Sequence, residues 1–179
     1  MAEFISNSWM EKVGQHWQAT NAVICGEVNI GLESSIWFGA CIRGDVAPIT
    51  LGHAVNVQEG AVLHCDTGEP LVIGNQVTIG HGAIVHCKSV GDGTLIGMNA
   101  VVLGRVVIGK NCIVAAGAVV SPGTQVPDGS VVMGVPAKVI RPVRDSELQD
   151  MRTNNRHYVE LAKDHAEHPE KFYQWRPEA

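Results

Sequence analysis

Three histidines, His64, His81 and His86, are the residues of this chain whose types and spacing best fit a metal site. Neutral imidazoles are common ligands of Zn²⁺, and three protein ligands leave one coordination position for water. An ion held by neutral ligands keeps its charge and lowers the pKa of bound water to about 7. Together these residues predict a catalytic metal site. The other histidines are interpreted as structural or surface residues: His16, His53, His157, His165 and His168.

A six-residue repeat of aliphatic residues supplies the scaffold for these histidines. The repeat matches neither a helix nor a long flat strand. It predicts a parallel β-helix, in which three short strands form one coil and each aliphatic side chain points inward. A sandwich of short strands is the alternative, but it would give irregular spacing. The repeated residues are Ile30, Ile36, Ile42, Leu51, Val57, Leu63, Ile73, Ile79, Val85, Ile96, Val102, Ile108, Val114, Val120, Val126 and Val132.

The register of the repeat predicts where the histidines lie. Ile42, Leu63 and Val85 take the same inward position in successive coils, so the residues after them should form one outward column. These following residues are Arg43, His64 and His86. Coils are about 4.8 Å apart, so the two histidines can share an ion. His81 lies one face earlier, near a corner, where it cannot easily reach the ion of its own chain but can reach the equivalent ion of a neighbouring subunit.

An alternative for the three histidines is a hydrogen-bonded cluster without metal. Cys65 and Cys87 directly follow the two stacked histidines, and alternation along a strand turns them away from the ion. We interpret them as packing residues.

The chain divides into an N-terminal cap segment (1–21), the β-helix (22–136), and an exit loop with a C-terminal helix (137–179). Ser146 with Gln149 predicts a capping box at the start of that helix. The helix should be about 20 residues, or about 30 Å, long, which matches six or seven stacked coils. We therefore expect it to lie along the β-helix. Its buried stripe should comprise Leu148, Met151, Asn155, Tyr158 and Ala162, and Pro169 should end the run.

Composition narrows the class of protein. Hydrophobic residues make up 45% of the chain and aromatic residues only 5%, which suits a core of stacked Ile, Val and Leu. The net charge of −5 argues against nucleic acid or an anionic membrane as a partner. We expect no membrane span and no signal peptide. The odd number of cysteines, five, implies no disulfide framework and favours the reducing cytoplasm.

Four segments resemble those of γ-class carbonic anhydrases, a hexapeptide-repeat family. They are Ile42-Arg43-Gly44-Asp45, Asn56-Val57-Gln58-Glu59-Gly60, Leu63-His64 and Gly80-His81-Gly82-Ala83-Ile84-Val85-His86. The resemblance to hexapeptide-repeat proteins covers residues 22–136 and implies a mainly β fold, a left-handed parallel β-helix with the C-terminal helix packed along it. It also implies a homotrimer.

The resemblance implies that His64, His81 and His86 bind Zn²⁺, with Fe²⁺ or Co²⁺ as alternatives, two ligands from one chain and one from its neighbour. It implies reversible hydration of CO₂ to bicarbonate by a metal-bound hydroxide. Gln58 matches a residue that hydrogen-bonds the metal-bound water. The remaining matches are Arg43 and Asp45, an ion pair at the trimer interface, Glu59, in a place usually taken by Asp, and Tyr158, a pocket tyrosine.

The chain differs from the best-known members of this family at the residues that export protons in those members. Val46 stands in place of an acidic residue, and the loop at 65–70 is short. Asp66 or Glu69 could shuttle protons, or they are solvated loop charges. Metal binding is therefore better supported than fast turnover. Two other functions compete on the same fold: a CoA-dependent acyltransferase or thioesterase, and a metal-bound trimer without catalytic activity.

Overall fold

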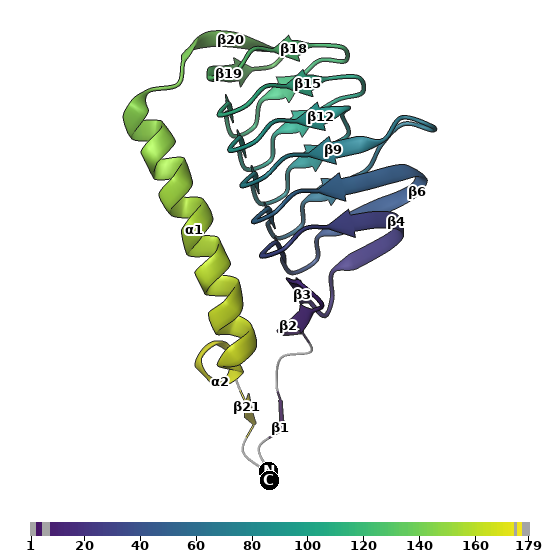
Figure 1. The fold of residues 1–179 in the computed structure, drawn as a ribbon, viewed down its shortest axis with the longest axis vertical. Coiled ribbons are helices and arrows are strands. Elements are labelled where there is room, and N and C mark those ends of the chain that lie inside the picture. Colours follow the sequence, from purple (N-terminus) through teal and green to yellow (C-terminus); the bar gives the residue numbers. More distant parts are fainter. Residues whose placement is uncertain (1–2, 5–7, 174, 177–179) are drawn as a thin grey trace.

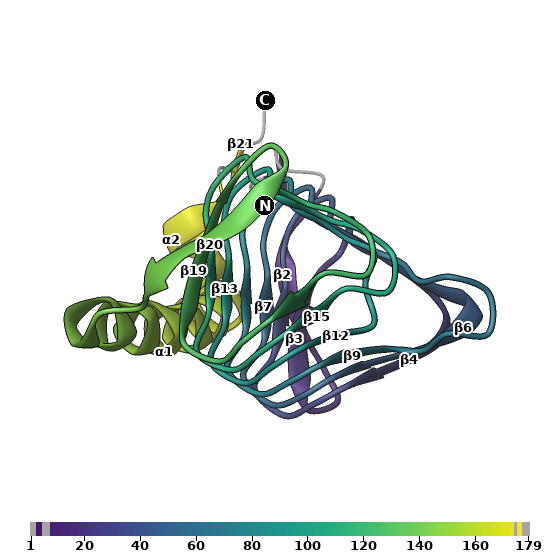
Figure 2. The ribbon, with the colours of Figure 1, turned by 90° about the horizontal axis from the view of Figure 1, so that it is seen from above.

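The protein folds into a parallel β-helix with a long helix beside it, as predicted (Figure 1). This computed structural model describes residues 3–4, 8–173 and 175–176. Each coil of the β-helix contributes short strands to three faces, so the molecule has a triangular outline when seen along the coil axis (Figure 2).

The strands stack with parallel pairing between successive coils. The first face holds β5 (Ser35–Ile36), β7 (Asn56–Val57), β10 (Thr78–Ile79), β13 (Leu95–Ile96), β16 (Ile113–Val114) and β19 (Ser130–Gly134). The second face holds β8 (Val62–Leu63), β11 (Ile84–Val85), β14 (Val101–Val102) and β17 (Val119–Val120). The third face holds β9 (Leu71–Ile73), β12 (Ser89–Val90), β15 (Val107–Ile108) and β18 (Gln125–Val126).

The pairing register confirms the column predicted from the repeat. Leu63 is the partner of both Ile42 and Val85, and all three side chains are fully buried. The inward aliphatic residues form one continuous core through the coils. Burying each such side chain contributes roughly 1.5–3 kcal/mol, so the stacked column fixes the register of the outward residues beside it.

Two long strands depart from the two-residue pattern of the other coils. Strands β4 (Val23–Ile30) and β6 (Cys41–Leu51) pair with each other and continue around the corner between the second and third faces. Figure 2 shows this corner protruding from the triangle. The first half of β6 pairs with β8 and its second half with β9, so β6 joins the two faces into one sheet.

Antiparallel hairpins flank the coils at both ends. Strands β2 (Met10–Val13) and β3 (His16–Ala19) form a hairpin whose second strand pairs in parallel with β5. At the far end, β19 pairs with β20 (Ala137–Pro142). A short pair joins β1 (Glu3–Phe4) to β21 (Trp175–Arg176) near the two ends of the chain.

Helix α1 (Asp145–Glu167) runs back along the coils and contacts β2, β3, β5 and β7. The predicted stripe is confirmed at Asn155 and Ala162, which are buried. The predicted capping box of Ser146 and Gln149 is wrong. Ser146 lies inside the helix, and the N-cap is Arg144, whose backbone N–H donates to Glu147.

Glu147, rather than Gln149, is the capping-box acceptor at the start of the helix. Its carboxylate also accepts two hydrogen bonds from Arg141 in the preceding strand. Each bond is 2.7 Å long, and this paired geometry is stronger than a single neutral cap. Helix α1 ends before Pro169, as predicted, and the four-residue α2 (Pro169–Phe172) follows.

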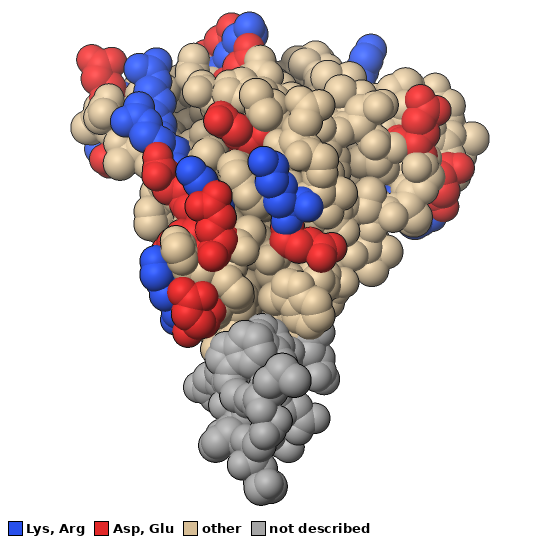
Figure 3. All heavy atoms as spheres, turned by 60° about the horizontal axis from the view of Figure 1, so that its bottom comes forward, with Lys and Arg blue, Asp and Glu red and all other residues tan. Residues whose placement is uncertain are grey.

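Charges of both signs are interspersed over the face shown in Figure 3. Acidic and basic groups lie directly beside one another at several places on this face, and neither sign forms a continuous field. Among the helices of the described part of the chain, none is long and apolar enough to cross a membrane.

Candidate metal centre

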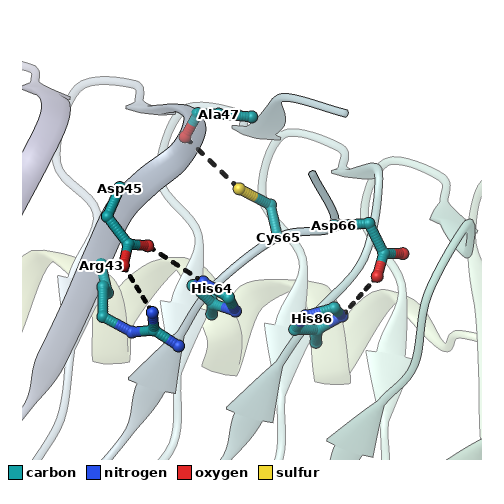
Figure 4. A network of polar contacts seen from close by, with 7 residues as sticks. All are labelled: Arg43, Asp45, Ala47, His64, Cys65, Asp66 and His86. Carbon is teal, nitrogen blue, oxygen red and sulfur yellow. Dashed lines mark hydrogen bonds and ion pairs between the residues drawn. The ribbon is translucent and has the colours of Figure 1, made fainter. Parts of the chain in front are cut away.

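His64 and His86 lie side by side on the outer side of the second face (Figure 4). His64 follows β8 and His86 follows β11, and these strands pair in register. The ring centroids are 5.2 Å apart. This spacing brings two imidazoles within reach of one ion, as the register predicted.

Asp45 connects these histidines to Arg43. The guanidinium of Arg43 donates to Asp45 Oδ2 at 2.6 Å, and Asp45 Oδ1 lies 3.2 Å from His64 Nε2. The hydrogen bond from Arg43 is the main reason that the pKa of Asp45 is lowered, so its carboxylate is ionised at neutral pH. We call the group of Arg43, Asp45, His64 and His86 the histidine face.

His81 lies elsewhere, on the turn that follows β10 between the first and second faces. Its Nδ1 lies 2.6 Å from Glu59 Oε2, and its backbone N–H donates to Gln58 Oε1 at 3.1 Å. Glu59 and His81 stack in adjacent coils, because the residue after His81 donates its backbone N–H to the Glu59 carbonyl. We call Gln58, Glu59 and His81 the corner group.

Tyr158 approaches the corner group from helix α1. Its ring packs edge-to-face on Trp37 with centroids 5.4 Å apart. Partial burial raises the pKa of Tyr158, and the nearby negative charge of Glu59 adds to this shift. The hydroxyl therefore stays protonated at neutral pH beside the corner group.

The eight predicted site residues thus separate into two groups on one chain. Arg43, Asp45, His64 and His86 form the histidine face, whereas Gln58, Glu59 and His81 form the corner group with Tyr158 beside them. Among the described residues, no three His, Cys, Asp or Glu side chains of one chain are placed to hold an ion.

The donor chemistry of the histidines fits a divalent metal. One ring nitrogen of each faces a carboxylate oxygen: His64 and Asp45 at 3.2 Å, His81 and Glu59 at 2.6 Å, His86 and Asp66 at 3.9 Å. Carboxylates at one nitrogen typically orient a ligating imidazole and leave the other nitrogen for the ion. Although Glu59 Oε2 is buried beside His81, the geometry is not that of a hydrogen bond, and this oxygen has no other partner among the described residues.

Cys65 and Cys87 point into the coils, as expected for packing residues. The Cys65 thiol donates to the Ala47 carbonyl, which secures the base of the protruding corner (Figure 4). Burial raises the pKa of the Cys87 thiol to about 12, so it is neither a nucleophile nor a thiolate ligand at neutral pH.

The candidate proton-shuttle residues differ in position. Asp66 lies beside His86 at the histidine face (Figure 4), whereas Glu69 is an exposed turn residue whose side chain forms no hydrogen bond or ion pair with the described residues. Val46 is partly exposed on β6 next to Asp45. Asp66 is therefore the acid closer to the histidines.

Sequence reasoning missed the polar residues behind Gln58. The Gln58 Nε2 donates to Asn56 Oδ1 at 3.1 Å, and the Asn56 Nδ2 donates to Thr78 Oγ1 at 2.8 Å. All three side chains are buried under the helix side of the first face. The available signal was the position of Asn56 and Thr78, each directly before an inward aliphatic residue.

Comparison with known proteins identifies relatives. The family described as bacterial transferase hexapeptide (six repeats) matches residues 87–122. The chain is 43% identical over 145 residues to a probable carbonic anhydrase of Methanocaldococcus jannaschii, covering 81% of this chain and 91% of that protein. It is 38% identical over 162 residues to the mitochondrial gamma carbonic anhydrase 2 of Arabidopsis thaliana. That match covers 87% of this chain but only 58% of the plant protein, so the chain spans little more than half of its length.

A solved structure shows the same architecture. A hexapeptide transferase family protein of Anaplasma phagocytophilum superposes with a TM-score of 0.80 and 35% identity. The match covers 84% of this chain and 89% of that one.

Proposed function

This chain belongs to the γ-carbonic anhydrase family of hexapeptide-repeat proteins, and on that premise we propose that it catalyses the reversible hydration of CO₂ to bicarbonate. The observation that carries the proposal is the stacked pair His64 and His86 on one face with His81 displayed at a separate corner. A second copy that packs its corner group against this face would supply the third imidazole.

We assign the metal ligands to His64 and His86 of one subunit and His81 of the next, in a homotrimer. Zn²⁺ suits three neutral imidazoles, and Fe²⁺ or Co²⁺ accept the same donors. The chemistry that such an ion supplies is a lowered pKa of bound water, so that a nucleophile is present at neutral pH. CO₂ and bicarbonate are the substrates of the proposed reaction.

Gln58 orients the reacting groups in this proposal. Its Oε1 already accepts from the His81 backbone and one Nε2 hydrogen already binds Asn56, so the other Nε2 hydrogen is available to a substrate oxygen. Gln58 thus acts as a donor rather than as a base. Tyr158 adds a neutral hydroxyl on the same side.

Arg43 and Asp45 order the histidine face. The ionised Asp45 accepts from Arg43 and faces one nitrogen of His64, which restrains the orientation of that ring. Both side chains remain about half exposed in one chain, which leaves them accessible to a neighbouring subunit. Asp66 beside His86 is placed to pass a proton to solvent.

The test is stopped-flow CO₂ hydration by protein prepared without air and loaded separately with Zn²⁺, Fe²⁺ or Co²⁺. We expect a weak to moderate rate that rises with pH between 6.5 and 9. Added imidazole should accelerate turnover if proton export limits the rate. His64→Ala should abolish the rate, whereas the control His53→Ala, on an exposed histidine outside both groups, should retain it.

Two competing functions have distinct outcomes. Acyl transfer or thioester hydrolysis with CoA substrates, suggested by the likeness to a hexapeptide transferase family protein, should be absent in the same preparation. If no metal form hydrates CO₂ above the buffer rate at any pH, the carbonic anhydrase proposal fails. CoA turnover would then favour the acyltransferase, and no turnover at all would favour a metal-bound assembly protein.

A further inference from the structure

A directional chain of hydrogen bonds runs from Thr78 to the corner group. Asn56 donates to Thr78 Oγ1 at 2.8 Å, Gln58 donates to Asn56 Oδ1 at 3.1 Å, and the His81 backbone donates to Gln58 Oε1 at 3.1 Å. Thr78, Asn56 and Gln58 are each at most 4% exposed. Buried polar groups without partners are costly, so such a chain holds its members in place.

The direction of each amide follows from its neighbours. A backbone N–H can only donate, so the atom of Gln58 that faces His81 must be its oxygen. The Nε2 of Gln58 then faces Asn56, which must present its own oxygen. The Nδ2 of Asn56 therefore faces Thr78, whose hydroxyl oxygen must accept this last hydrogen bond. A flipped Asn56 would place two N–H donors against each other.

We propose that Thr78 is a positioning residue that fixes the orientation of Gln58 through Asn56. Thr78 comes from β10, the strand that leads directly into the His81 turn. Its hydroxyl oxygen is the acceptor recorded for Asn56 Nδ2, and without it this buried donor loses its partner. Asn56 could then rotate and release Gln58, whose free N–H would no longer be held toward the corner group.

The catalytic consequence of this inference rests on the proposed function, whereas the orientation of the amides does not. Thr78 itself contacts Asn56, so it acts only through the two amides. The matched substitutions are Thr78→Val, which removes the acceptor but keeps a β-branched side chain suited to a strand, and Thr78→Ser, which keeps the hydroxyl. Thr94→Val serves as the control for loss of a buried hydroxyl in the next coil.

Thr94 is a fair control because its side-chain hydrogen bonds lead away from the corner group, and its backbone carbonyl, which accepts from the Thr78 N–H, is retained in Thr94→Val. Its hydroxyl donates to the Gly109 carbonyl and accepts from the Cys112 backbone N–H. Neither partner contacts Gln58 or His81. A general loss of stability would therefore appear in both Thr78→Val and Thr94→Val. A loss of Gln58 orientation would appear only in Thr78→Val.

The first measurement is the kinetics of fully metallated protein. We expect Thr78→Val to lower kcat for CO₂ hydration about tenfold, with metal content and oligomeric state unchanged, as is typical when a partner of an active-site group is lost. Thr78→Ser should stay within about twofold of the parent because the acceptor is retained. Thr94→Val should retain the parent kcat. Equal kcat values for Thr78→Val and Thr94→Val would overturn the proposal.

The second measurement is NMR of the side-chain amides of Asn56 and Gln58 in the metal-free protein. Buried, hydrogen-bonded NH₂ groups should exchange slowly with water in the parent, in Thr78→Ser and in Thr94→Val. Both groups should lose this protection in Thr78→Val. Unchanged protection in Thr78→Val would overturn the proposal even if the parent hydrates CO₂. Loss of protection in a protein without CO₂ hydration would retain the positioning role and reject the proposed function.

Discussion

Each of the three proposed ligands has a carboxylate beside one ring nitrogen, supplied by Asp45, Glu59 and Asp66. The closest of these contacts joins His81 and Glu59, at 2.6 Å. The Glu59 carboxylate reaches the imidazole from the adjacent coil. At the scale of single residues, these acids would orient the imidazoles of the proposed metal site.

Replacing Glu59 by Gln should weaken metal binding. The carboxylate that we propose orients the His81 ring would become a neutral amide, and losses of this kind typically reduce metal affinity about 10- to 100-fold. The measurement is competition for Zn²⁺ against a chromophoric chelator. Glu69→Gln is the matched control, because Glu69 is exposed in the 66–70 loop, and it should bind Zn²⁺ like the parent. Equal affinity in the two variants would contradict the orienting role.

At this scale the sequence predicted where the site residues lie in the coils better than it predicted their hydrogen-bond partners. The six-residue period places His64 and His86 in one column because every inward aliphatic residue fixes the residue after it. The chain from Gln58 to Thr78 could not be read from the period, since it depends on side-chain rotamers under the helix. The contacts of Asp45 and Asp66 with the histidines could not be predicted from the period either. Both acids lie in corners, outside the repeated positions.

At the scale of elements, a buried polar contact ties helix α1 to the β-helix. Asn155 Nδ2 donates to the Ala54 carbonyl at 2.8 Å. Ala54 lies in a corner turn with a positive φ of 52°, so its carbonyl is presented outward to the helix. The contact fixes the helix one turn before Tyr158, and it therefore helps to place that ring beside the corner group.

Asn155→Ala should destabilise the fold by about 1–3 kcal/mol, because it leaves the buried Ala54 carbonyl without its side-chain donor. Chemical unfolding followed by circular dichroism measures this change at fixed protein concentration. Asn154→Ala, at the exposed neighbouring position, is the control and should change the free energy of unfolding little. If both variants unfold alike, the helix is held by its apolar contacts alone.

The N-terminus of α1 should give a specific dependence of stability on pH. The hydrogen bonds from Arg141 lower the pKa of Glu147 to about 2 from an ordinary value of 4.5. The depressed pKa means that Glu147 stabilises the folded state fully above pH 4.5 and loses this effect as the pH falls toward 2. Glu147→Gln should therefore lower the urea midpoint at pH 7.

The difference between Glu147→Gln and the parent should shrink between pH 4.5 and pH 2, because the parent carboxylate is then protonated as well. Asp150→Asn is the control, because Asp150 is an exposed carboxylate farther along α1 that forms no ion pair with the described residues. A difference that stays constant over this pH range would show that the charge of Glu147 does not stabilise the helix start.

The elements themselves were largely predictable, with two informative exceptions. The helix start was misassigned because Ser146 and Gln149 fit a capping pattern, while the stronger partner of Glu147 lies outside the helix at Arg141. The protruding corner arises where β4 and β6 stay paired beyond the usual two residues. A local repeat cannot predict either feature, since both depend on pairing between separate segments.

At the scale of the whole molecule, the β-helix holds the histidine face and the corner group at separate positions around its triangular cross-section. A chain with such a division cannot join its own two groups without unstacking its core, whereas rotation about an axis outside the chain and parallel to the coils can bring the corner of one copy to the face of the next. Closed cyclic symmetry repeats this heterologous contact without leaving an exposed half. The division thus favours a cyclic assembly with sites between subunits, which is the arrangement of the proposed trimer.

Mixing two inactive variants tests this arrangement directly. His81→Ala keeps the histidine face and His64→Ala keeps the corner group, so trimers that contain both variants can form intact sites. After joint unfolding and refolding in equal amounts, random assembly should restore about a quarter of the sites. Zn²⁺ content and CO₂ hydration should both recover to about this level, whereas each variant refolded alone should recover neither. The control mixture is His64→Ala with His86→Ala, because both substitutions damage the same face and no arrangement of subunits repairs it. Recovery in the control mixture, or failure of the first mixture to regain metal despite forming mixed trimers, would reject a site built from the face of one subunit and the corner of another.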